Sequence, residues 1–164
     1  MQTPPNRYLG ILQTLVDHRV EFLIVGGVAA VLQGAPINTF DLDVVHSTDP
    51  ANVSRALAAL QELDAIYRAQ PDLRLRPAAS HLSSAGHQLL ITRLGPLDLL
   101  GSIGKGRTYP DLLTHTTEMK VGPSLSIRVL DLETQIVVKE EVGGEKDQAA
   151  LPILRRTLEE LRKR

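Results

Sequence analysis

The feature that most constrains this chain is a strand, a glycine pair, a short helix and a second strand in close succession. Residues 22–25 (Phe-Leu-Ile-Val) form a short apolar run that predicts a buried strand. Gly26-Gly27 predicts a turn, and the apolar residues 28–32 predict one or two turns of helix. Residues 39–45 predict the second strand, which carries two acids at alternate positions.

Those two acids are Asp41 and Asp43. Side chains two positions apart on a strand point to the same side, so the two carboxylates are expected to converge. Adjacent carboxylates repel each other unless a cation or a proton joins them, and oxygen-only ligands suit Mg²⁺. The glycine pair lets the backbone approach a ligand closely, and the helix after it offers free N–H groups to an anion. The segment therefore predicts a phosphate-binding turn beside a metal site.

Each half of this pattern also has an ordinary explanation. An isolated glycine pair is most often only a turn, and an Asp-x-Asp is often a solvated strand edge or loop. In this order, however, the two motifs resemble the signature of the nucleotidyltransferase superfamily with the DNA polymerase β-like catalytic core. The chain is most similar to the small stand-alone bacterial and archaeal members, which include nucleotidyltransferase-like toxins of toxin–antitoxin systems.

The resemblance implies nucleotide-binding roles for further residues. Four more positions match the family pattern: Thr39, Lys139, Lys146 and Asp147. In such relatives the helix lysine lies near the nucleotide phosphates, although ordinary solvated lysines explain Lys139 and Lys146 equally well. The chain departs from the family at Ile37 and Gly144, where arginine is expected.

A third acid stands later in the chain. Residues 87–93 predict a strand, Gly95-Pro96 a turn, and residues 97–100 a second strand in which Asp98 is the only acid. A buried Asp without a partner is costly, so it needs a cation or a proton. The resemblance implies that Asp98 is the third metal carboxylate and, if any protein group serves, the general base. The alternative is an edge-strand Asp that faces water.

Residues 67–84 lack clear periodicity and carry Arg68, Arg74 and Arg76. A basic surface loop is the simpler interpretation, because connecting segments are usually just exposed. The functional interpretation is a mobile strand or loop at the rim of the site that contacts the acceptor substrate. The family resemblance does not extend to this segment.

Composition limits the remaining choices. A chain of 164 residues is long enough for one domain with a real core and short for two. The net charge of −1 and the 3% aromatic content argue against a broad phosphate-neutralising surface and an aromatic base-stacking surface. Cysteine is absent, which excludes disulfides and thiolate metal sites. The N-terminus lacks a signal pattern and no apolar run has the length of a membrane span, so a cytoplasmic location is expected.

The last third predicts two helices. Asp131 is the expected N-cap of the first, Gly143-Gly144 interrupts it, and Leu151, Leu154, Leu158 and Leu161 give the second a buried stripe. Leu132, Ile136 and Val137 are expected to face inward on the first helix, and Pro152 to kink or restart the second. We therefore predict one α/β (α+β) domain: a mixed sheet flanked by helices over 1–128, and a C-terminal helical pair over 129–164.

The function predicted from the residues and the resemblance is metal-dependent transfer of an NMP from an NTP to a hydroxyl. Asp41, Asp43 and Asp98 would hold Mg²⁺ or Mn²⁺, and nucleotide contacts would come from Gly26, Gly27, Thr39, Lys139, Lys146 and Asp147. The acceptor could be an RNA 3′ end, a protein hydroxyl or a small molecule, and the toxin-like role implies a cognate antitoxin. The alternative is a non-catalytic nucleotide- or partner-binding member of the same fold.

Overall fold

The computed structural model describes residues 6–164. The first five residues, which belong to the N-terminus where the sequence predicts no signal peptide, lie outside the described residues. The elements follow in the order α1 (Asn6–Asp17), β1 (Phe22–Val25), α2 (Gly26–Leu32), β2 (Leu42–His46), α3 (Pro50–Glu62), β3 (Ile66–Tyr67), η1 (Pro71–Leu73), α4 (Ala79–Leu82), β4 (His87–Thr92), β5 (Gly95–Leu100), α5 (Tyr109–Leu113), β6 (Thr116–Val121), β7 (Leu125–Leu130), α6 (Leu132–Val142) and α7 (Glu145–Arg162).

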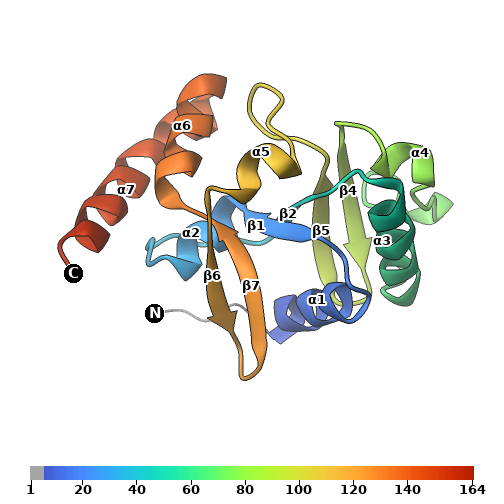
Figure 1. Ribbon diagram of the computed structural model, residues 1–164. Coiled ribbons are helices and arrows are strands. Elements are labelled where there is room, and N and C mark those ends of the chain that lie inside the picture. Colours follow the sequence, from blue (N-terminus) through green and yellow to red (C-terminus); the bar gives the residue numbers. More distant parts are fainter. Residues whose placement is uncertain (1–5) are drawn as a thin grey trace.

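The strands form one seven-stranded sheet in the order β3-β4-β5-β2-β1-β7-β6. Strand β2 is parallel to β5 and antiparallel to β1, while β1 is parallel to β7, so the sheet is mixed. The α6–α7 pair lies at one end of the molecule, and α3 and α4 lie at the other (Figure 1). The predicted mixed sheet flanked by helices, with a C-terminal helical pair, is confirmed.

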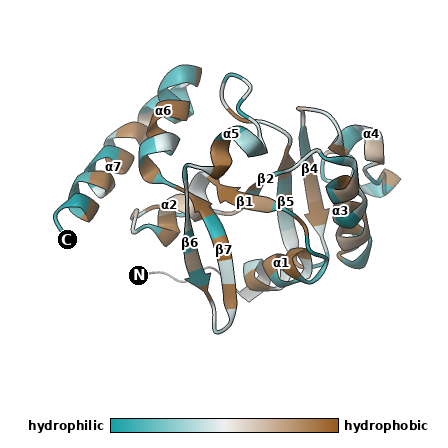
Figure 2. Cartoon of the chain, in the orientation of Figure 1, coloured by the Kyte–Doolittle hydropathy of each residue, from teal (hydrophilic) through white to brown (hydrophobic). Residues whose placement is uncertain are grey.

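Apolar side chains cover both faces of the sheet, but unequally. Helices α1, α2 and α3 contribute most of the helical side chains in the main core on one face. On the other face α5 supplies Tyr109 and Leu112 to a smaller cluster over β1, β2 and β7. A third cluster joins α2 to α6 and α7. In Figure 2 hydrophobic residues accordingly concentrate on the central strands, while α6 and α7 alternate between hydrophobic and hydrophilic residues. Within residues 6–164, we find no helix with the length and apolar character of a bilayer span.

Capping residues mark the ends of helices α3 and α6. The Asp49 carboxylate accepts from the Ala51 N–H at 3.4 Å, with Pro50 opening α3. The Asp131 carboxylate accepts from the Thr134 N–H at 2.7 Å at the start of α6. Gly143 ends α6 with φ +69°, a conformation that glycine adopts without strain.

Five local predictions need correction. Helix α2 begins at the glycine pair itself rather than after it, and Asp41 lies in a bend just before β2. The 67–84 segment contains the short helices η1 and α4, and α7 continues through the exposed Pro152 without the restart that was one of the two predicted outcomes. Val137 is 40% exposed, because the helical repeat places it on the same side of α6 as the exposed Glu133 and Glu140.

His46 at the end of β2 is a buried polar residue that lacks full compensation. The side chain is 1% exposed, and its Nδ1 lies 3.1 Å from the Ser47 carbonyl oxygen. Its Nε2 is the one buried side-chain polar atom in the described part of the chain without a hydrogen-bond partner. Burial lowers the pKa of His46, although the contact with Ser47 opposes the shift.

We expect His46→Leu to reduce the fall in the free energy of unfolding as the pH drops from 7 to 5. Because the folded pKa is lowered, the unfolded chain takes up a proton at a higher pH than the folded protein, so the free energy of unfolding falls as pH drops below about 6.5. Urea titrations between pH 7 and pH 5 measure that slope. His115→Leu, at an exposed histidine, is the matched control and should retain the wild-type slope. Equal slopes for His46→Leu and the wild type would contradict the assignment.

Candidate active site

Two carboxylates stand side by side on the central parallel strand pair. Asp43 on β2 is the register partner of Asp98 on β5, and Val25 and Leu89 continue the same row on β1 and β4. Register partners point to the same side of a sheet, so the two acids are adjacent. Asp98 is 8% exposed on an interior strand, which excludes the alternative of an edge acid facing water.

The glycine pair is required by close packing against this row. Gly26 has φ +69°, and a Cβ there would collide with the Asp43 Oδ2 atom. A Cβ on Gly27 would lie 2.8 Å from the Thr39 Cβ. The start of α2 is therefore pressed against the first carboxylate strand, and three predicted site residues (Gly26, Gly27 and Thr39) belong to this one contact.

Arg68 connects the remaining acids. Its NH1 donates to Asp98 Oδ1 at 2.9 Å, and its NH2 lies 3.9 Å from Asp41 Oδ2. The Arg68 side chain is 33% exposed and the Asp98 side chain 11%, so this ion pair is partly withdrawn from water. All three predicted carboxylates are thus brought together, with a guanidinium among them.

The crowding of carboxylates shows in the protonation of Asp43. Burial, the hydrogen bond to Asp98 and the negative charges of Asp98 and Asp41 together raise the pKa of Asp43 to about 8, against the opposing effect of Arg68. Asp43 therefore retains a proton at neutral pH that an ordinary aspartic acid has lost.

The donor set fits a hard divalent cation. Three carboxylates supply oxygen ligands only, and their mutual repulsion is the kind that a bound cation relieves. Among residues 6–164, however, no three acidic, His or Cys side chains already form a metal-holding group. The Arg68 guanidinium lies against two of the three acids instead.

A cavity of about 200 Å³ opens beside the carboxylates. Gly26 and Asp43 line it from the sheet side, and Lys139 and Asp147 line it from the C-terminal helices. Lys139 Nζ lies 3.3 Å from Asp147 Oδ1, so the cavity holds a cation already paired with an acid. Four residues predicted from widely separated parts of the sequence therefore line one cavity.

The loop between β5 and α5 closes one side of this cavity. Ile103 and Gly104 line it, and Arg107 pairs with Glu141 on α6 through two guanidinium nitrogens. The hydrogen bond from Arg107 is the main reason that the pKa of Glu141 is lowered. The glycine-rich loop is thereby attached to α6 next to Lys139.

Other predicted residues lie further out. Asp98 belongs to the carboxylate row and Asp41, Gly27 and Thr39 lie near it, but none of these four residues lines the cavity. Lys146 is an exposed residue on α7. The sequence groups Arg68 with Arg74 and Arg76 in a basic segment and does not assign it to the carboxylates. The one sequence signal of Arg68 is its position directly after Ile66-Tyr67, a short strand-like pair.

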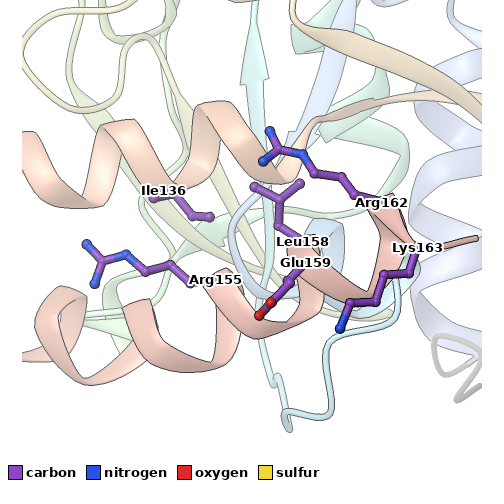
Figure 3. Close-up of a pocket in the computed structure, with 6 residues that line it drawn as sticks. All are labelled: Ile136, Arg155, Leu158, Glu159, Arg162 and Lys163. Atoms are coloured by element: carbon purple, nitrogen blue, oxygen red, sulfur yellow. The ribbon is translucent and has the colours of Figure 1, made fainter.

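A larger hollow of about 480 Å³ lies elsewhere, between α6 and α7 (Figure 3). Ile136 and Leu158 form its apolar part, with Arg155, Glu159, Arg162 and Lys163 around them. Arg155 pairs with Glu140 at 3.2 Å and Arg162 with Glu133 at 3.3 Å. Its arginines are thus paired with acids across the two helices, and it lacks the convergent carboxylates of the first site.

Comparison with known proteins identifies the fold. No protein-family model matches the sequence, and no curated protein is similar to it at a significant level. A Thermotoga maritima protein provisionally assigned as a nucleotidyltransferase superposes with a TM-score of 0.59 and 20% identity, covering 97% of this chain and 96% of that chain. The lincosamide antibiotic adenylyltransferase LnuA, bound to lincomycin, superposes with a TM-score of 0.61 and 14% identity, covering 94% and 98%. The chain therefore has a nucleotidyltransferase fold over nearly its whole length, as its sequence predicted.

We expect Gly26→Ala to destabilise the protein more than Gly106→Ala. Both glycines have positive φ, so both substitutions carry a backbone penalty of about 1–2 kcal/mol. Only Gly26 faces a neighbour, because nothing lies within 4 Å of a Cβ on Gly106. The collision with Asp43 should add about 1–3 kcal/mol to the loss in free energy of unfolding, measured by urea titration. Equal losses would show that Asp43 moves aside without cost.

We also expect the metal-free protein to lose stability as pH rises toward about 8. Since the pKa of Asp43 is raised, the folded protein keeps a proton that the unfolded chain releases near pH 4, and the free energy of unfolding falls between these values. Asp43→Asn mimics the protonated acid and should remove this part of the decline. Thermal melts in EDTA at pH 5 and pH 8 provide the measurement, and parallel profiles for variant and wild type would contradict the raised pKa.

Proposed function

We propose that this protein is a metal-dependent nucleotidyltransferase that moves an NMP from an NTP to a hydroxyl acceptor. The observation that carries the proposal is the pairing of Asp43 with Asp98 beside a cavity that also contains Gly26 and Lys139. Oxygen ligands for a cation and a basic group for phosphates are the two requirements of phosphoryl-type transfer. The shared fold of nucleotidyltransferases supports the same conclusion.

Each residue has a proposed role. Asp41, Asp43 and Asp98 would hold Mg²⁺ or Mn²⁺, which when bound neutralises triphosphate charge and lowers the pKa of the acceptor hydroxyl. Lys139, now paired with Asp147, would neutralise the pyrophosphate that leaves. The backbone N–H groups at Gly26 and Gly27 would contact phosphate oxygens.

The reaction is a displacement at the α-phosphorus of the NTP. The acceptor oxygen forms a bond to that phosphorus, while the bond from phosphorus to the bridging oxygen breaks and pyrophosphate departs with the electron pair. The acceptor proton passes to a base, and Asp98 is the protein group we propose for it. Thr39 and Lys146 are proposed as outer contacts to the nucleotide.

Different observations support different classes of acceptor. LnuA is an antibiotic adenylyltransferase and is covered almost completely by this chain, which supports a small-molecule hydroxyl. The resemblance to toxin-like members supports an RNA 3′ end or a protein hydroxyl, together with a cognate antitoxin. The net charge of −1 argues against extended contact with nucleic acid.

A non-catalytic nucleotide-binding protein is the second candidate. It is supported by Ile37, which packs against the apolar cluster of α2, α6 and α7 instead of supplying a cation. Gly144 likewise serves only as the N-cap residue of α7. Calorimetry with NTP, with and without EDTA, combined with the assay below separates binding from transfer.

We expect Asp43→Asn and Asp98→Asn to reduce transfer at least about 100-fold, because loss of a ligand should exceed the effect of losing an outer-shell partner. The assay follows label from each α-labelled NTP into total RNA, total protein and small hydroxyl compounds such as lincomycin, with Mg²⁺ or Mn²⁺. Asp64→Asn, whose acid pairs with Arg74 and Arg76, is the matched control and should keep full activity.

Full activity in both site variants would rule out the mechanism. Metal-dependent NTP binding without transfer to any acceptor class would instead support the non-catalytic candidate. Thermal melts of each variant exclude unfolding as the cause of a lost activity.

A further inference from the structure

Arg68 is placed unlike the other arginines of its segment. Arg74 NH2 lies 3.1 Å from Asp64 Oδ2, and Arg76 pairs with the same acid, which is 47% exposed. Those two arginines follow the simple interpretation of a basic surface segment. Arg68 instead reaches the carboxylate row, where it contacts Asp98 and Asp41.

The backbone of β4 holds Arg68 in this position. The Arg68 N–H donates to the Leu89 carbonyl at 3.0 Å, which prolongs the pairing of β3 with β4. Its NH1 donates to the Leu90 carbonyl at 3.0 Å as well as to Asp98. The uncharged backbone carbonyls of β4 therefore help to fix the position of Arg68 beside the acids.

The Arg68 guanidinium lies against carboxylate oxygens that a divalent cation would need as ligands. Asp98 Oδ1 accepts the Arg68 NH1 at 2.9 Å, so this oxygen is engaged by a cation of the chain itself. The second nitrogen, NH2, lies 3.9 Å from Asp41 Oδ2, so a single guanidinium spans two of the three proposed ligands. The planar, permanently charged guanidinium suits such a span better than an ammonium group.

We propose that Arg68 is the internal counter-ion of the site: it neutralises Asp98 and Asp41 in the metal-free protein and must release Asp98 before that carboxylate can ligate a cation. The inference rests on the metal-dependent function proposed above. Arg68 is thus a positioning residue that sets the metal concentration at which the site fills. Its removal should strengthen metal binding, whereas removal of an ordinary structural residue would weaken it.

The test is a titration with Mn²⁺, in which electron paramagnetic resonance measures the free ion and no catalysis is needed. The proteins are the full-length wild type, Arg68→Gln, Arg68→Lys and the control Arg74→Gln. We expect Arg68→Gln to bind Mn²⁺ at least about tenfold more tightly than the wild type, and Arg74→Gln to match the wild type. Arg68→Lys should bind with intermediate affinity, because an ammonium cannot span both acids.

A second readout comes from stability without metal. Arg68→Gln should melt at a lower temperature than the wild type in EDTA, since Asp98 and Asp41 then lack their counter-ion, and Mn²⁺ should restore more stability to it than to the wild type. Arg68→Lys supplies the affinity comparison if Arg68→Gln does not fold.

Unchanged or weaker Mn²⁺ binding in the Arg68 variants, with measurable binding by the wild type, would overturn the role of Arg68 alone. Wild-type affinity in Arg68→Lys would also overturn it, because net charge would then explain the glutamine variant. Failure of every protein, wild type included, to bind Mn²⁺ would overturn the metal-dependent function as well.

Discussion

Three carboxylates lie close together at the edge of the hydrophobic core, and other groups must offset their burial and mutual repulsion. Burial removes the water that would stabilise their charges, and each acid makes its neighbours harder to ionise. The metal-free protein meets this cost in two ways: Arg68 neutralises Asp98, and Asp43 keeps a proton near neutral pH. Under the metal-dependent function proposed above, a bound divalent cation would take over the neutralising role of both the arginine and the proton.

The sheet topology determines which acids meet. Antiparallel pairing of β1 with β2 brings Val25 and the following Gly26 next to Asp43, and parallel pairing of β2 with β5 brings Asp98 to the other side. The opposite face of the same strands carries the main hydrophobic core. The alternation of strand side chains thus allows one set of strands to supply both the core and the charged row.

Much of this arrangement could be predicted from the sequence. The apolar residues 22–25, the cap Asp131 and the lone acid of the 97–100 strand each carry a local signal, because their physical requirement is local. Arg68 carries almost no local signal in the sequence. Its role depends on the register of β3 against β4 and on the parallel β2–β5 pair, and both are long-range pairings that one sequence does not reveal. The start of α2 differs from the prediction for a related reason: Gly26 and Gly27 are needed for close packing against Asp43 and Thr39, and not for a turn before the helix.

The C-terminal helices explain one departure from the family pattern. Ile37, which stands where a cation is expected, packs on the apolar cluster that joins α2 to α6 and α7. That cluster holds α6 in place, and α6 presents Lys139 to the cavity beside Asp43. At position 37 an apolar contact therefore stands in place of the expected arginine, and that contact is part of the packing of the helix that carries Lys139. The basic group of the cavity is therefore Lys139, which lies on a helix that this apolar cluster holds against α2.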